Sequence, residues 1–169
     1  CVVKAIFWEL YMDPLQINTP RLKLVLNSPE EMRAAIQAMD EATREQVSAE
    51  WLARVEQADV ADPWIHGFQL RLLDDDSVVG RCGFKAPPAD GMVEIAYGVE
   101  PDYEGRGFAT ECAAAMTDYA LEQDGVLRVW AHTLPEENAS GSVLKKCGFT
   151  KVGEVVDPDD GPVWRWEKQ

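Results

Sequence analysis

The sequence predicts a single mixed α/β domain, with a central mixed sheet of six to seven strands flanked by about four helices. Strand-like and helix-like segments follow the order β-α-α-β-β-β-α-β-α-β-β, with hairpins first and alternating helices and strands after them. The chain has 169 residues, of which 46% are apolar and six are Trp. It is long enough to bury a core, and no repeat or linker divides it.

The first elements are a strand and two helices. Residues 21–26 alternate as a strand does. Residues 27–31 supply a capping side chain, an early proline and first-turn acids, which predict a helix to about Met39. A second helix is expected over residues 48–58, with one apolar face formed by Trp51, Leu52 and Val55.

A hairpin is predicted next. Residues 64–73 and 78–85 have the pattern of strands, joined by the polar turn Asp74-Asp75-Asp76-Ser77. We interpret the three aspartates as a solvated turn, although a metal site would use the same residue type. Residues 86–91 form the next loop.

Residues 92–99 form a strand whose two faces differ. One face is bulky and apolar, and the other is small apart from one carboxylate. A strand buried on both faces would be bulky throughout, so the small face leaves room for a ligand beside the carboxylate. The bulky face holds Val93, Ile95, Tyr97 and Val99, and the small face holds Glu94, Ala96 and Gly98.

The second half of the chain alternates helices and strands. A helix follows residue 107, a strand covers 127–133, a helix covers 138–146, and residues 149–156 and 163–167 form a closing hairpin. The first of these helices is expected to pack on the sheet through Phe108, Cys112, Met116 and Tyr119.

The loop after the 92–99 strand reads EPDYEGRGFAT. Gly105 and Gly107 bracket Arg106 just before a helix and, lacking a Cβ, let the backbone approach a ligand closely. Free N–H groups at a helix N-terminus favour an anion, and Arg106 can add charge-assisted contacts. The segment therefore predicts a pyrophosphate site, although a glycine turn that merely starts a helix has the same pattern.

Three segments of the chain, in order, resemble one family. Residues 104–110 resemble the Q/R-x-x-G-x-G/A signature of the GNAT superfamily of N-acetyltransferases, with Glu104 in place of the usual Gln or Arg. Residues 19–24 look like the opening strand of the branch that contains the ribosomal-protein alanine acetyltransferases. Residues 139–149 are similar to the A-S-x-x-V-L-E-K-x-G-F segment of that branch. The resemblance extends from residue 19 to about residue 167.

The resemblance implies a GNAT-like fold and acetyl transfer from acetyl-coenzyme A to a primary amine, by direct attack in a ternary complex. The acceptor would be a protein N-terminus or a small-molecule amine. The backbone of residues 97–99 would pair with the pantetheine arm like an added strand. The family's pantetheine-binding Asn falls on Glu137, and we expect Asn138, one place later, to replace it. The implied cofactor-binding residues are Tyr97, Gly98, Val99, Glu104, Gly105, Arg106, Gly107, Phe108, Ala109, Thr110 and Asn138.

Two residues are implied as catalytic. Glu94 matches a position where many relatives carry an acid, and partial burial would raise its pKa toward that of a useful base. The alternative is an exposed or structurally paired glutamate. Ser140 aligns with the branch's serine and would contact the thiol or the substrate, or else cap its helix. Leu144 replaces the tyrosine that many relatives use to protonate the thiolate. His132 is a second candidate base or substrate contact, or a hydrogen-bonded strand histidine.

Charge and composition limit the partners. The formal net charge of −14 opposes nucleic-acid binding, because phosphates would be repelled. It is compatible with an amine substrate and equally with a surface that serves only solubility. No apolar run is long enough to cross a membrane. The four cysteines and two histidines lack metal-ligand spacing, so we expect a cytoplasmic protein with reduced cysteines and no metal.

Residues 1–13 are expected to be an N-terminal extension outside the match, and residues 14–169 the acetyltransferase domain. A homodimer through the extension or a strand edge is compatible with the sequence. The alternative function is a non-catalytic acyl-coenzyme A-binding or sensing domain, favoured by the missing tyrosine and displaced asparagine. Glu94 and residues 106–110 oppose it, and no feature favours a purely structural subunit.

Overall fold

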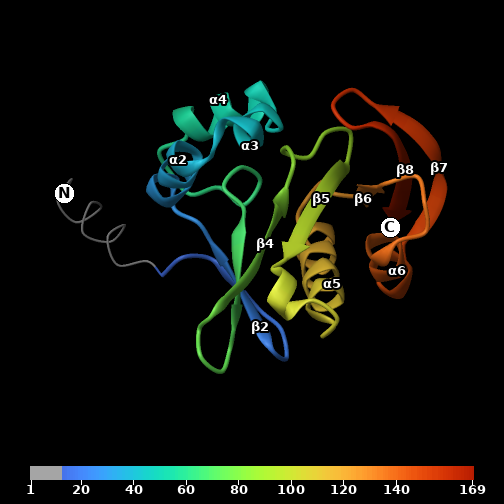
Figure 1. Ribbon diagram of the computed structural model, residues 1–169, viewed down its shortest axis with the longest axis horizontal. Coiled ribbons are helices and arrows are strands. Elements are labelled where there is room, and N and C mark those ends of the chain that lie inside the picture. The colour runs from blue at the N-terminus through green and yellow to red at the C-terminus, as the bar shows by residue number, and fades with distance from the viewer. Residues whose placement is uncertain (1–12) are drawn as a thin grey trace.

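The computed structural model describes residues 13–169, which form one eight-stranded mixed sheet with helices against it (Figure 1). Except for Asp13, the predicted extension lies outside the described residues. The predicted mixed α/β fold class is confirmed. The strands are β1 (Gln16–Asn18), β2 (Leu22–Leu26), β3 (Phe68–Leu72), β4 (Val78–Phe84), β5 (Met92–Val99), β6 (Arg128–Thr133), β7 (Thr150–Asp157) and β8 (Gly161–Lys168). The helices are α2 (Pro29–Ala38), α3 (Glu41–Glu45), α4 (Ala49–Gln57), the 3₁₀ turn η1 (Pro101–Tyr103), α5 (Phe108–Leu121) and α6 (Ala139–Lys146).

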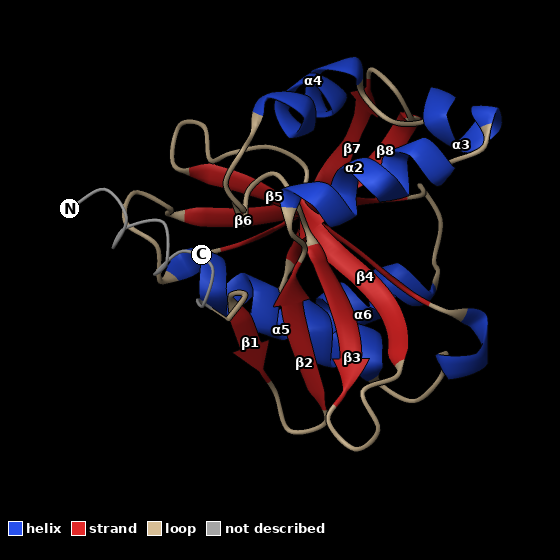
Figure 2. Ribbon diagram, turned by 90° about the vertical axis from the view of Figure 1, so that its left-hand side faces the viewer, coloured by secondary structure: helices blue, strands red, loops and turns tan. Residues whose placement is uncertain are grey.

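The strand order in the sheet is β1-β2-β3-β4-β5-β6-β8-β7. Neighbouring strands run antiparallel except β5 and β6, which are parallel and are joined by the crossover helix α5. Figure 2 shows α5 and α6 on one face of the sheet, with α2, α3 and α4 together beyond one end of β2 to β4.

The described chain has more strands and helices than predicted, because short elements escape pattern-based reasoning. β1 has three residues and pairs antiparallel with β2, with Ile17 opposite Leu24. α3 has five residues and is capped by Asp40, whose Oδ1 accepts the Thr43 N–H at 2.7 Å. Neither element is long enough to display a hydrophobic period.

The strand predicted to begin at Trp64 begins instead at Phe68. Asp62 folds the preceding residues into a turn: its Oδ1 accepts the Trp64 N–H at 2.8 Å, and its carbonyl accepts the His66 N–H at 2.9 Å. Gly67 then adopts a left-handed φ of +66°. The side-chain oxygen of Asp62 thus competes with strand pairing, which apolar patterning alone does not reveal.

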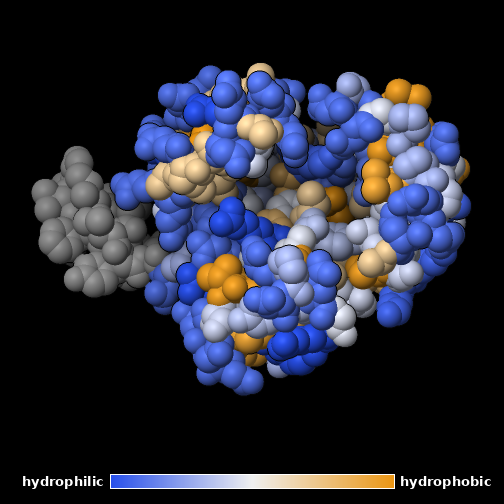
Figure 3. Space-filling view, viewed as in Figure 1, coloured by the Kyte–Doolittle hydropathy of each residue, from blue (hydrophilic) through white to orange (hydrophobic). Residues whose placement is uncertain are grey.

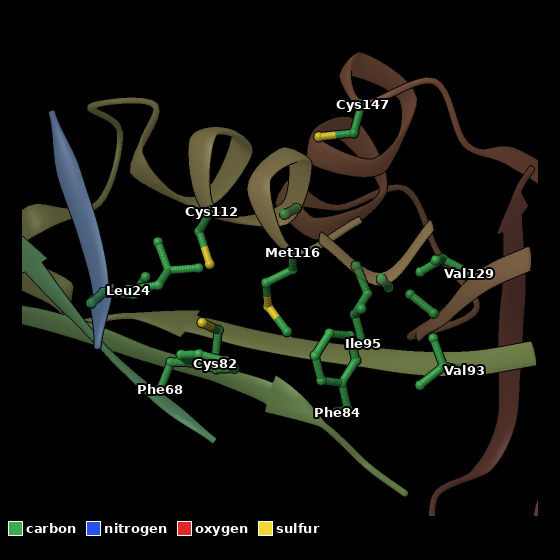
Figure 4. Close-up of a cluster of buried hydrophobic side chains, with 14 of the residues drawn as sticks. Leu24, Phe68, Cys82, Phe84, Val93, Ile95, Cys112, Met116, Val129 and Cys147 are labelled. Carbon is green, nitrogen blue, oxygen red and sulfur yellow. The ribbon is translucent and has the colours of Figure 1, made fainter. Parts of the chain in front are cut away.

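The predicted inner face of α5 is confirmed. Cys112 and Met116 are completely buried, and Phe108 is 7% exposed. Figure 4 shows Cys112 and Met116 pointing toward side chains of β4 and β5, including Cys82, Phe84 and Ile95. Tyr119 completes the face in an aromatic group with Trp64, Phe68 and Phe84. This packing fixes α5, and so the loop before it, against the centre of the sheet.

Strands β5 and β6 pair over only three positions and then diverge. The last pair is Glu94 opposite Trp130. Beyond it β5 stays with β4 as far as Val99, and β6 stays with β8 as far as Thr133. The β6-facing edge of residues 95–99 therefore has no strand partner, and the sheet opens there (Figure 1).

Gly80 permits the close approach of β4 to β5 at this opening. A Cβ at Gly80 would lie 2.3 Å from the Gly98 carbonyl oxygen, whereas one at Gly98 would meet nothing within 4 Å. We expect Gly80→Ala to destabilise the fold by about 1–3 kcal/mol, the usual cost of overpacking. Gly98→Ala is the matched control and should change stability by less than about 0.5 kcal/mol. Chemical denaturation measures both, and equal effects would refute the close-approach argument.

Candidate active site

A cleft of about 320 Å³ lies where β5 and β6 diverge. Figure 3 shows this part of the surface as a hollow facing the viewer. The cleft brings together three residues singled out from the sequence: Glu94, His132 and Ser140. The full lining is Lys85, Glu94, Ile95, Ala96, Tyr97, Ala131, His132, Thr133, Leu134, Ser140, Asp160 and Val163.

One wall of the cleft is the open edge of β5. Tyr97, Gly98 and Val99 pair with β4 on one side and with no strand on the other. Such an edge can accept an extended ligand through main-chain hydrogen bonds. The Tyr97 side chain is partly buried against the core, and burial raises the pKa of its phenol above the ordinary value. Tyr97 therefore offers its backbone rather than its hydroxyl.

The glycine loop presents a row of free donors. Gly105 and Gly107 have left-handed φ values of +73° and +83°, which other residues adopt with strain. Gly107 begins the 14-residue helix α5 without a side-chain cap. The N–H groups of Phe108, Ala109 and Thr110 donate to no acceptor within residues 13–169. They lie at the positive end of the helix dipole, an arrangement suited to an anion such as a diphosphate.

Arg106 extends from this loop toward solvent. Its guanidinium donates to the Asp102 carbonyl at 3.1 Å and lies 5.3 Å from the centre of the Tyr103 ring. These contacts hold the side chain beside the loop while most of its donors remain available. Arg106 can thus supply a positive charge where the backbone supplies N–H groups.

Arg21, which directly precedes β2, supports the loop, a role that sequence reasoning missed. Its Nη1 donates to the Arg106 carbonyl at 2.9 Å, and its guanidinium stacks on Phe108 at 4.7 Å. Glu111 on α5 holds Arg21 in place through bonds of 2.8 Å from both Nε and Nη2. Arg21 therefore joins the first strands to the loop. The only signal in the sequence was its place in the 19–24 segment.

Glu111 is ionised by the same contacts. Burial alone would raise the pKa of this carboxyl, but hydrogen bonds from the Thr19 hydroxyl and from Arg21 lower it. The Thr19 hydroxyl donates to Oε1 at 2.5 Å, as does the Arg21 backbone N–H at 2.8 Å. A charged, nearly saturated carboxylate makes a rigid anchor for Arg21.

Glu94 lies in a charged cluster at the other part of the cleft. Its side chain is 10% exposed, with Oε1 3.2 Å from Lys85 Nζ and 3.7 Å from His132 Nδ1. Burial raises the pKa of Glu94, and the nearby Lys85 only partly opposes that shift. The pKa of Glu94 is raised, as expected from its burial. Glu94 also has a charged partner in Lys85, so the alternative of a structurally paired glutamate describes this residue as well.

The residue that caps α6 differs from one of the expectations. Asn138, not Ser140, caps the helix, because its Oδ1 accepts the Gly141 N–H at 2.9 Å. The capping alternative for Ser140 is therefore wrong, and its side chain lines the cleft. Glu137 instead pairs with Lys145 at the surface, at 2.9 Å. Leu144, at the position where many relatives are expected to carry a tyrosine, is completely buried. A leucine cannot act as an acid, so no acid group is available at this position.

No membrane-spanning helix and no metal-binding group is found within the described residues. None of their helices is long and apolar enough to cross a bilayer. No three of their His, Cys, Asp and Glu side chains cluster as metal ligands would. The three described cysteines, Cys82, Cys112 and Cys147, are buried and unbridged.

The chain belongs to the Acetyltransferase (GNAT) domain family, whose profile matches residues 9–150. It is 31% identical over 91 residues to a Bacillus licheniformis protein named uncharacterized N-acetyltransferase p20, a match that covers 53% of this chain and 51% of that protein. The chain thus spans about half the length of the curated relatives it matches most strongly.

Solved structures share the fold at low sequence identity. A GNAT-family acetyltransferase from Bacillus anthracis superposes with a TM-score of 0.65 at 18% identity, covering 91% of this chain and 98% of that one. RimL, a ribosomal L7/L12 alpha-N-protein acetyltransferase solved in complex with coenzyme A, has a TM-score of 0.63 at 16% identity, covering 91% and 97%. The superfamily predicted from the three sequence segments is confirmed.

We expect Arg21→Gln to weaken coenzyme A binding by about tenfold, or about 1.4 kcal/mol. The variant loses the guanidinium contacts to Arg106 and Phe108, so the loop's donors are less well ordered. Isothermal titration calorimetry with coenzyme A measures the effect. Arg54→Gln, which breaks an exposed pair with Glu50 on α4, is the matched control and should bind as the wild type does. Equal affinity in both variants would contradict the role given to Arg21.

Proposed function

We propose that the protein is an acetyl-coenzyme A-dependent N-acetyltransferase that acts on a primary amine by direct attack in a ternary complex. One observation carries the proposal: the open edge of β5 has a buried carboxylate in the cleft at one end and, beyond its other end, a row of free N–H donors at the start of α5. An extended thioester with a diphosphate at one end matches this order of binding groups. Membership of the GNAT domain family supports the same activity.

The cofactor would lie along β5 with its diphosphate at the glycine loop. The backbone edge of residues 97–99 would bind the pantetheine arm, and the N–H groups of residues 105–110 would bind the diphosphate with Arg106. A Cβ at Gly105 would meet no atom within 4 Å, so space for a ligand exists there. Asn138 uses its Oδ1 in the helix cap, which leaves its amide N–H group for the arm.

Glu94 would remove a proton from the acceptor ammonium, whose free pKa of about 10 leaves little neutral amine at pH 7. Its raised pKa suits this task better than that of an exposed carboxylate. The neutral amine would attack the thioester carbonyl, forming a C–N bond and breaking the C–S bond. A thiolate with a pKa of about 8.5 is an adequate leaving group without an acid at Leu144. Ser140 lines the cleft and would contact the thiol or the acceptor.

The acceptor belongs to one of two classes, a protein N-terminus or a small-molecule amine. The name of RimL refers to a protein N-terminus, which is the first of these classes. The cytoplasmic location and the homodimer stay predictions.

We expect Glu94→Gln to lower the turnover of the acetyltransferase reaction by about 10²–10⁴-fold, because the amide cannot accept the ammonium proton. Thiol release from acetyl-coenzyme A is measured with Ala- and Ser-starting peptides, polyamines and aminoglycosides. The matched control is Glu56→Gln, an exposed carboxylate on α4, which should turn over as the wild type does.

The same assay separates the possible outcomes. Reduced turnover in Glu94→Gln with unchanged coenzyme A affinity supports the proposal and identifies the acceptor class. Equal turnover in Glu94→Gln and wild type would remove Glu94 as the base. Tight binding of coenzyme A without turnover on any amine favours the non-catalytic binding domain.

A further inference from the structure

Glu94 has a neighbour that the mechanism above does not use. His132 of β6 places Nδ1 3.7 Å from Glu94 Oε1 and 3.3 Å from Asp157 Oδ2. Its side chain is only 9% exposed and lines the cleft. Neither ring nitrogen makes a hydrogen bond of good geometry to any residue in the described part of the chain. Buried polar atoms are nearly always satisfied, so this imidazole calls for an explanation.

Asp157 is held in place to face the imidazole. Its Oδ1 accepts the N–H groups of Asp159 at 2.9 Å and Asp160 at 3.0 Å, within the β7–β8 turn. The other oxygen is directed at His132. Burial would raise the pKa of Asp157, but the two N–H donors outweigh it and lower that pKa. An ionised carboxylate therefore stands ready to stabilise a positive imidazolium.

The surroundings of His132 come from four strands and one turn. Carboxylates favour its charged form, whereas burial and nearby cations oppose it. Burial dominates and lowers the pKa of His132, with Asp157 acting in the opposite direction. The ring is therefore neutral at pH 7 and able to accept a proton. The charged groups around it are Lys85 on β4's end, Glu94 on β5, Asp157 on β7, Asp160 in the turn and Arg165 on β8.

Amide formation from an ammonium requires the nitrogen to lose two protons. One leaves before the attack, and the second leaves after the C–N bond has formed. A single carboxylate can hold only one of them. Two adjacent acceptors, a carboxylate and a neutral imidazole, can hold both within the cleft.

We propose that Glu94 and His132 form a two-site proton acceptor, with Asp157 holding the imidazolium. This rests on the proposed acetyltransferase function. Glu94 takes the first proton from the ammonium and passes it to His132 Nδ1. The carboxylate is then free to accept the second proton once the C–S bond has broken. One proton finally neutralises the thiolate and the other passes to water, so the products are the amide, the free thiol and one proton.

The pairing of His132 with Asp157 is tested without turnover. The chain has only two histidines, so His132→Gln assigns the imidazole signals in a proton NMR titration. We expect the pKa of His132 to fall further in Asp157→Asn, because the stabilising carboxylate is lost. Glu154→Gln, an exposed carboxylate on the same strand, should leave that pKa unchanged. An unshifted pKa in Asp157→Asn would overturn the pairing.

The relay is tested by kinetics against pH. We expect His132→Gln to lower the turnover of the wild-type acceptor by about tenfold to a hundredfold and to change the pH profile, while coenzyme A affinity stays within about twofold. The double variant Glu94→Gln/His132→Gln should lose much less than the product of the two single losses, because either change breaks the same relay.

The outcomes distinguish the relay from the proposed function. Full activity and an unchanged pH profile in His132→Gln, with an active wild type, would overturn the relay alone. Losses that multiply in the double variant would also overturn it. A wild type that turns over no amine would overturn the proposed function, and the relay with it.

Discussion

The candidate site depends on where two parallel strands stop sharing hydrogen bonds. β5 and β6 separate after Glu94 because each keeps its other neighbour. β5 lies close to β4 where Gly80 permits it, and β6 stays with β8, where the Trp166 indole N–H donates to the Thr133 hydroxyl at 3.0 Å. Unpaired backbone groups in a sheet interior are costly unless a ligand or water satisfies them. The divergence of β5 and β6 therefore creates the cleft, and it also leaves unpaired backbone groups that a ligand or water can satisfy.

The position of Glu94 at this point combines two properties. It belongs to the last residue pair of the parallel ladder, so its backbone is fixed, while its side chain lies where the strands begin to separate. Burial there raises its pKa, and the cleft gives it access to a ligand.

The rest of the fold holds the two ends of the cleft. The inner face of α5 packs on the sheet and aims the helix N-terminus at the open edge of β5, while Arg21 and Glu111 tie the loop to β2. At the other end, Asp157 at the end of β7 faces His132, and Asp160 in the β7–β8 turn faces Lys85, which also pairs with Glu94. Packing thus positions the anion-binding loop, and charged contacts organise the end where proton transfer is proposed.

The sequence by itself determined the features that depend on near neighbours. Strand 92–99 was predicted with the bounds of β5. A cap within residues 27–31 was predicted with its helix, and the glycine loop with its helix start, because periodicity, caps and φ preferences act over a few residues. The GNAT family followed from the order of three such segments. Only the tertiary structure decided which distant residues meet. Arg21 and Glu111 are 90 residues apart, and Glu94, His132 and Asp157 come from three strands. Their contacts depend on strand order and on the divergence of β5 and β6, which no local pattern encodes.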